Sequence, residues 1–290
     1  MRKRGVGLHS AVPAVFVFTL AARAQCPAPP PLEEILSRLA DSQERAVEAR
    51  RTIVYQQNAL VRLWRANGRL AREERRTYLV TPAPAGTEKK LERFEGRYEN
   101  RGQLLPYTSP GFTRGDCDLD GALIQSLTDE WLNDRSSRDG IASDLFPLTR
   151  REQQGYRFTF EGCQTVAGRP AFLLRFQPRG KDGGESKPWA GEVFVDPEEY
   201  QPRVVSTKLA WNVPAAVRIL FGTNIRQLGF SVAFQEVGQG LWFPSSYGTE
   251  FSLRVLFGYR RNITLNVVNS DFRRTDVEST VSFPEGIVEP

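Results

Sequence analysis

The chain has 290 residues, of which 40% are hydrophobic and 25% charged, and its formal net charge is +5 at pH 7. This composition is typical of a soluble globular protein, and the length suits one large β domain or two ordinary domains. The only histidine, His9, lies in an N-terminal segment with the features of a cleaved signal. A mature chain without histidine excludes Ser-His-Asp and Cys-His catalysis and histidine-ligated metals.

Residues 1–24 have the organisation of a secretory signal peptide. Residues 2–4 are basic, residues 11–22 form an apolar core, and residues 22–24 (Ala-Arg-Ala) form a small-residue cleavage site. We therefore expect cleavage after Ala24 and a periplasmic protein. Cleavage removes four basic residues and no acid, which lowers the net charge from +5 to +1. A nearly neutral mature chain is not expected to bind nucleic acid.

Three cysteines remain after the signal: Cys26, Cys117 and Cys163. In an oxidising compartment Cys117 and Cys163 are the candidate disulfide, which would connect the middle helix to the second half of the sheet. Cys26 lies in a Pro-rich spacer, residues 25–31, and is expected to be unpaired. Lipid anchoring at Cys26 is disfavoured because residues 23–25 (Arg-Ala-Gln) are a poor context for lipidation.

The spacing of apolar residues predicts a first helix over residues 32–50, with Pro31 at its start and acids in its first turn. Strands are expected from Thr52 to Trp64, from Arg69 to Val80 after an Asn-Gly turn, and from Leu91 to Asn100. Arginines and acids alternate in these strands, which favours cross-strand ion pairing on a solvated face, with an anion site as the alternative. They are Arg62, Arg72, Arg75, Arg76, Arg93, Arg97, Glu73, Glu74, Glu92 and Glu95.

Residues 107–116 have the composition of a loop, and residues 119–135 are predicted to form a second helix. The sequence between them, Asp116-Cys117-Asp118-Leu119-Asp120-Gly121, has the start of an EF-hand loop. The twelfth position is Leu127 instead of the bidentate glutamate that calcium requires. We therefore interpret these acids as residues that cap the second helix or are favoured by its dipole at the helix start, and no metal is expected.

Residues 156–211 alternate apolar and polar side chains, which predicts an antiparallel meander with a phenylalanine-rich face. Residues 213–222 are apolar without alternation and suit a short packed helix or loop; the alternative is a mobile flap containing Val217, Ile219, Leu220 and Phe221, or a patch that touches membrane transiently. Strands follow at residues 230–237, 242–257 and 261–268. Residues 273–290 form a polar tail, in which residues 281–283 are a candidate edge strand. The pattern predicts one α+β domain of about ten strands and two or three helices.

Several short sequence motifs occur in a specific order: residues 166–172 (VAGRPAF), 191–198 (GEVFVDPE) and 241–244 (LWFP), followed by Asn269 and Phe272 in the closing strand. With the preceding signal, helix and hairpin, this order resembles the LolA/LolB/LppX/RseB superfamily, in particular outer-membrane lipoprotein-sorting proteins. The resemblance covers about residues 32–272, and Phe194 stands where tryptophan is common in the family. No residue singles out the activity of one member.

The resemblance implies a single half-barrel, an antiparallel sheet curled around its helices with an apolar concave face. It also implies a non-catalytic carrier of an acylated lipid or lipoprotein without cofactor; the alternative is an envelope adaptor or stress sensor that binds another protein. The two acid clusters, residues 116–120 and Glu198-Glu199, lie in turn-like contexts that need no catalysis to explain them. The residues expected to line the trough, or to pack under the helices instead, are Phe158, Phe160, Phe172, Leu174, Phe176, Val205, Leu209 and Trp211.

Overall fold

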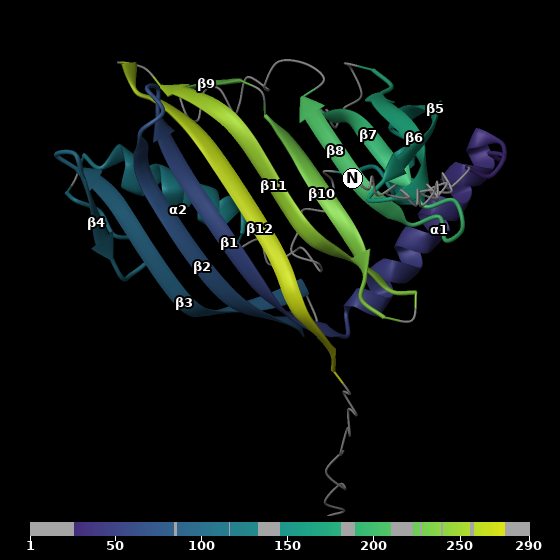
Figure 1. The fold of residues 1–290 in the computed structure, drawn as a ribbon, viewed down its shortest axis with the longest axis horizontal. Helices are drawn as coiled ribbons and strands as arrows, with labels where there is room; N and C mark the ends of the chain where they lie inside the picture. Colours follow the sequence, from purple (N-terminus) through teal and green to yellow (C-terminus); the bar gives the residue numbers. More distant parts are fainter. Residues whose placement is uncertain are drawn as a thin grey trace, which may run out of the picture.

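The computed structural model describes residues 26–83, 86–115, 117–132, 146–180, 189–209, 223–226, 228–238, 240–255 and 258–275. Within these ranges, twelve antiparallel strands form one twisted sheet that three helices accompany (Figure 1). The order across the sheet is β4-β3-β2-β1-β12-β11-β10-β8-β7-β6-β5, and β9 pairs with the end of β11. In the described part of the chain β4 and β5 each have a neighbour on one side only. The sheet is therefore open, and the predicted α+β half-barrel is confirmed.

The first half of the sheet precedes the second helix, and the second half follows it. The helices are α1 (Leu32–Arg50), α2 (Leu119–Trp131) and α3 (Arg150–Gln153). The strands are β1 (Ile53–Arg65), β2 (Leu70–Ala83), β3 (Gly86–Asn100), β4 (Gln103–Tyr107), β5 (Tyr156–Val166), β6 (Arg169–Pro178), β7 (Trp189–Val195), β8 (Pro202–Leu209), β9 (Thr223–Arg226), β10 (Gly229–Glu236), β11 (Trp242–Val255) and β12 (Arg260–Arg274).

The last strand, β12, joins the second half of the sheet to the first. β12 pairs with β1 over almost its whole length, so that Val267 lies opposite Ala59 and Leu265 opposite Val61. These side chains are buried, as is every second residue of β1 from Ile53 to Leu63. A strand with this alternation has one buried and one wetter face. We call the buried side of the sheet the inner face and the opposite side the outer face.

The helices pack on the inner face. Ile35 and Leu39 of α1 and Ile124 of α2 belong to the same core cluster as the inner residues of the strands. Figure 1 shows α2 behind β1 and β2, and α1 beside the half of the sheet that contains β5–β8. Among the residues that the structure describes, no helix is both long and apolar enough to cross a membrane.

α1 begins where the sequence predicts, directly after Pro31, and it is fixed to the turn between β7 and β8. The Ser42 hydroxyl donates to the Tyr200 carbonyl oxygen (2.7 Å), and Gln43 Nε2 donates to Gln201 Oε1 (2.8 Å). At the C-terminal end of the helix, Arg50 Nε donates to the carbonyl oxygen of Trp242 (2.9 Å). These contacts orient α1 along the inner face.

The predicted elements and the observed ones differ in places. The third strand begins at Gly86, five residues before its predicted start at Leu91, and the helix predicted over residues 119–135 ends at Trp131. Two short strands, β4 and β9, were not predicted: β4 has five residues and contains Pro106, and β9 has four, too few for an alternating pattern. The predicted signal, Trp211, the flap residues and residues 276–290 lie outside the described residues.

Candidate functional site

The inner face of β5–β8 carries most of the residues predicted to line an apolar trough. Phe172, Leu174, Phe176 and Val205 are at most 1% exposed, and Phe158 is 8% exposed. These five side chains share one core cluster with residues of α1 and α2. Of the two alternatives, the structure therefore places this set under the helices as packed core.

Phe160 differs from the other trough residues. It lies on β5, at the free edge of the sheet, and is 36% exposed. Its ring packs edge-on against that of Phe172, with centroids 5.9 Å apart. A β-bulge between Phe160 and Gly162 interrupts the pairing with β6 directly after Phe160, and the pairing resumes at Gly162. Phe160 therefore presents an apolar ring to solvent beside a closed aromatic core.

A second group of incompletely covered apolar residues lies where β7, β8 and β10 meet. Trp189 is opposite Leu209 in the ladder, and Leu209 N donates to the carbonyl oxygen of Leu228 (3.1 Å). All three residues are half-buried, and the Trp189 ring packs edge-on against Phe230, with centroids 5.4 Å apart. Phe160 is in register with Leu174 and Val193, four residues along β7 from Trp189, so it is separate from this second group. We call the two places together, Phe160 and the group of Trp189, Leu209 and Leu228, the apolar margin, because both are incompletely covered apolar surface beside the core.

Aromatic packing beneath the margin depends on a glycine. Phe176 contacts the rings of Tyr156 and Phe158, with centroids 5.7 and 5.8 Å away, and lies opposite Gly191 of β7. A Cβ atom on residue 191 would lie 2.7 Å from Phe176 Cζ and 1.9 Å from the Ser206 carbonyl oxygen. Glycine at this position therefore lets the Phe176 ring lie directly on the backbone of β7.

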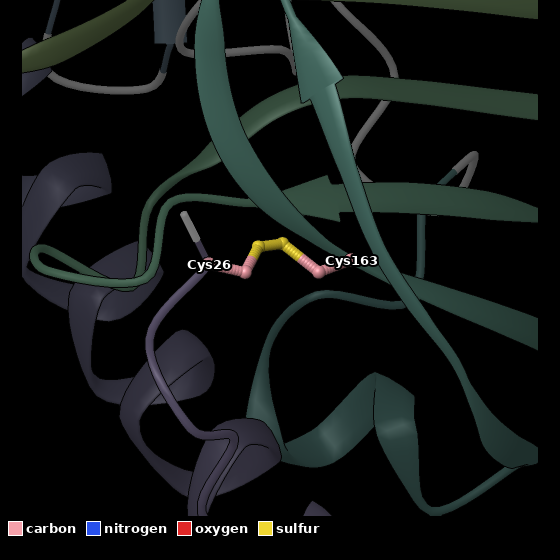
Figure 2. Close-up of a disulfide and its surroundings, with 2 residues drawn as sticks. All are labelled: Cys26 and Cys163. Atoms are coloured by element: carbon pink, nitrogen blue, oxygen red, sulfur yellow. A yellow bond between two sulfur atoms is a disulfide. The ribbon is translucent and has the colours of Figure 1, made fainter. Parts of the chain in front are cut away.

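The predicted disulfide between Cys117 and Cys163 is wrong. Cys163 pairs with Cys26, whose Cα atom is 6.3 Å away (Figure 2). Cys117 is free and exposed. Cys163 lies opposite Phe172 on the inner side of β5, where the spacer leading into α1 passes. Cys117 precedes α2, whose first turn is bound to β2 and β12, several strands away from β5 in the sheet. The disulfide therefore ties the start of the domain to its edge strand.

The acids at the start of α2 are held by buried arginines. Asp118 caps the helix by accepting from Gly121 N (3.1 Å), and it accepts from Arg72 Nη1 of β2 (2.9 Å). Asp120 accepts from both Nε and Nη2 of Arg261 on β12, at 2.7 and 2.9 Å. The capping interpretation is confirmed for Asp118, the N-cap residue, whereas Asp120 lies in the first turn of the helix and pairs with Arg261. Asp116 lies outside the described residues, among which no group of three or more His, Cys, Asp or Glu is placed to hold a metal ion.

Arg72 belongs to a larger buried network on the inner face of β2. Its Nε donates to the Tyr107 hydroxyl (2.8 Å), which in turn donates to Glu74 Oε1 (2.7 Å). Glu74 also accepts from Arg76 Nε (2.9 Å). All four side chains are buried. These residues form ion pairs as predicted, but the pairs are neither cross-strand nor on a solvated face, because Arg72 pairs with the cap of α2 and Arg76 with Glu74 of its own strand. Their alternation with Tyr78 and Val80, both buried, was the sequence signal for an inner position.

Electrostatics fix the protonation of this network. Burial opposes ionisation of Asp118, but hydrogen bonds from Arg114 and Gly121 and the charge of Arg72 outweigh it and lower the pKa of the carboxyl. Burial and the neighbouring Glu74 carboxylate raise the pKa of the Tyr107 phenol well above its ordinary value. Asp118 is thus ionised and the Tyr107 phenol is protonated at neutral pH, a state suited to static ion pairs.

The second acid cluster, in the turn after β7, also has structural partners. Asp196 accepts from the backbone N–H of Glu198 and Glu199, at 2.9 and 3.0 Å, and from Arg203 Nε (3.0 Å). Glu199 accepts from Trp242 Nε1 (2.5 Å). These contacts shape a turn on which α1 rests. Asp196 and Glu199 therefore hold the shape of this turn.

No protein-family model and no curated protein sequence matches this chain. Solved structures similar to it include a domain named as an outer membrane lipoprotein-sorting protein from Vibrio parahaemolyticus (13% identity, TM-score 0.35, 84% of this chain and 95% of that one). A DUF1329 family protein from Desulfovibrio piger (11%, 0.34, 87% and 96%) and a chain of the Pseudomonas aeruginosa MucA/MucB complex (13%, 0.21, 82% and 99%) are also similar. These likenesses concern the fold alone.

Proposed function

We propose that this protein is a non-catalytic, exported binding protein that takes up the acyl chain of a lipid or lipoprotein at the apolar margin. The observation that carries the proposal is the position of Phe160, which is 36% exposed although it touches Phe172, which is 1% exposed. An acyl chain that covers exposed apolar surface is stabilised by about 0.8 kcal/mol for each methylene removed from water. The margin therefore favours a hydrocarbon ligand without any covalent step.

The absence of catalysis is part of the proposal. After removal of residues 1–24 the chain has no histidine. The acids Asp118, Asp120 and Asp196 are held in ion pairs with arginine, and Glu199 is held by Trp242. A general base needs a carboxylate or imidazole that can reach a substrate proton. These four carboxylates are instead engaged in fixing α2 and the turn after β7.

The test is binding of a fluorescent fatty-acid analogue to protein purified without detergent, combined with native mass spectrometry for a co-purified lipid. We expect saturable binding that falls at least fivefold in Phe160→Glu and in Leu209→Glu, because each variant places a charge where the hydrocarbon would lie. Val268→Glu is the matched control: Val268 is 51% exposed but lies on the outer face. Equal loss in all three variants, or no binding by the wild type, would refute the proposal.

A protein partner is the competing ligand for the same surface. A photo-crosslinking amino acid placed at residue 209, introduced in living cells, separates the two. Lipid adducts support the carrier, whereas adducts with one defined envelope protein support an adaptor that uses the same half-barrel. The wild-type residue is half-buried, so the crosslinker samples what covers the margin.

A further inference from the structure

The outer face of β1–β3 carries three arginines around a single carboxylate. Glu73 lies directly opposite Arg62 on one side and Arg97 on the other, and Arg75 is two residues further along β2. Arg62 Nε lies 2.6 Å from Oε2 of Glu73, and Arg97 Nη2 and Arg75 Nε lie 2.8 and 3.3 Å from Oε1. Three guanidinium groups thus converge on one acid. We call these four residues the arginine cluster.

The carboxylate is buried beneath the cations. The Glu73 side chain is 4% exposed, while those of Arg62, Arg75 and Arg97 are 29%, 54% and 45% exposed. A guanidinium carries five N–H donors, and one carboxylate has about four acceptor positions. Most donors of the cluster therefore have no acceptor on Glu73. They are available on the solvent side of the sheet.

Neighbouring acids do not neutralise this surface. Glu95 is opposite Arg75 in the ladder, and Arg93 is two residues before it on β3. Both are exposed. Counted together, four arginines and two glutamates leave two positive charges in excess on this part of the outer face.

Arginines of the inner face are matched differently. There three arginines each have a carboxylate: Arg72 pairs with Asp118, which also accepts from the more exposed Arg114, Arg76 pairs with Glu74, and Arg261 pairs with Asp120. The inner face needs this match because an unpaired buried charge is costly. On the outer face the fold requires no more than one arginine for Glu73. The two additional cations are consequently unexplained by packing.

We propose that the arginine cluster binds phosphate groups of anionic phospholipids and so docks the outer face of β1–β3 on a membrane surface. Guanidinium groups bind phosphate oxygens through paired N–H donors, and several in one place attract an anionic bilayer. The site lies on the opposite face of the sheet from α2 (Figure 1). It is separate from the apolar margin and does not depend on the acyl-binding proposal.

The experiment is co-sedimentation with vesicles of phosphatidylcholine alone or mixed with phosphatidylglycerol. We expect binding to the mixed vesicles only, decreasing as salt is raised. The double variant R75Q/R97Q should bind about tenfold to thirtyfold more weakly, from the usual contribution of each basic residue near an anionic bilayer. The control R157Q/R169Q removes the same charge from exposed arginines of β5 and β6 and should bind like the wild type. Equal weakening of both double variants would overturn the proposal.

A third variant separates binding from stability. Glu73→Gln removes the negative charge from the cluster, so it should lower stability but strengthen binding to the mixed vesicles. Weaker binding by folded Glu73→Gln would contradict the proposal. Inorganic phosphate is the second probe: if it raises the wild-type melting temperature while neither vesicle is bound, the site takes free anions and the membrane assignment is wrong. Phe160→Glu should still bind vesicles, which keeps this test independent of the apolar margin.

Discussion

Arg261 of β12 and Asp120 in the first turn of α2 form a two-point ion pair, with Nε–Oδ1 and Nη2–Oδ2 distances of 2.7 and 2.9 Å. The two side chains are 14% and 8% exposed, and the Tyr259 hydroxyl donates to the same carboxylate (2.6 Å). The pair connects the closing strand of the sheet to the helix that covers its first half. The pair therefore links α2 directly to the inner face of the sheet.

Breaking this pair should destabilise the protein strongly. We expect Arg261→Ala to lower the free energy of unfolding by about 3 kcal/mol, because it leaves Asp120 as a largely buried carboxylate without its main counterion. Arg175→Ala is the control, since Arg175 pairs with Glu192 at the surface and exposed pairs contribute about 0–1 kcal/mol. Urea denaturation of both variants measures the difference. Similar losses in the two would show that the pair does not hold α2.

Acid should weaken the protein through Asp118 and Asp196. Burial opposes ionisation of both carboxyls, but their hydrogen-bond donors and arginine partners lower the pKa of each below its unfolded value. A carboxyl with a lower pKa in the folded state adds stability that is present above its unfolded pKa of about 4 and is lost as pH falls through the folded pKa. We expect unfolding free energy to change little from about pH 7 to 5 and to fall below about pH 4.

The variant Asp118→Asn tests whether Asp118 causes the loss of unfolding free energy at acid pH. Asparagine keeps the size of the side chain but does not titrate, so the variant should be less stable at neutral pH and lose less stability between about pH 4 and 2. Thermal or urea unfolding across the pH series provides the measurement. If the variant loses as much unfolding free energy at low pH as the wild type, the loss comes from other carboxyls.

The disulfide gives a prediction with a built-in control. Loss of the Cys26–Cys163 bond, with its sequence separation of 137 residues, should cost up to about 5 kcal/mol in the chain-entropy model. Cys26→Ser and Cys163→Ser should be equally destabilised, whereas Cys117→Ser should unfold like the wild type. Thiol titration of the native wild-type domain should find one reactive cysteine. Destabilisation by Cys117→Ser alone would contradict the assigned pairing.

Local patterns in the sequence predicted much of the fold. α1 was placed correctly because Pro31 and an apolar stripe mark its start and its buried face. Alternation likewise put Phe158, Phe172, Leu174 and Phe176 on one side of β5 and β6, which is the observed inner face. These features depend on neighbours within a few residues. A single sequence contains that information directly.

Long-range pairings were harder to predict. The partner of Cys163 depends on the path of the spacer before α1, which no periodicity encodes. Charge in β2 indicated ion pairs but not the face on which each arginine lies, so Arg72 and Arg76 were assigned to solvent although they are buried. The apolar margin was missed as a unit because Trp189 and Leu228 become neighbours of Leu209 only when β7, β8 and β10 assemble. Tertiary assembly, rather than local propensity, decides these positions.

Substitutions at Phe176 and Phe160 should distinguish the role of the packed core from that of the apolar margin. Phe176 is fully buried between Tyr156, Phe158 and the backbone at Gly191, so Phe176→Ala should cost about 3–5 kcal/mol of unfolding free energy. Phe160 is partly exposed, so Phe160→Ala should cost about 1 kcal/mol or less. The order should reverse for acyl binding: Phe160→Ala should lose affinity while folded Phe176→Ala, assayed well below its melting temperature, retains more of it. If Phe160→Ala binds the fatty-acid probe like the wild type, the exposed ring is not part of the binding surface.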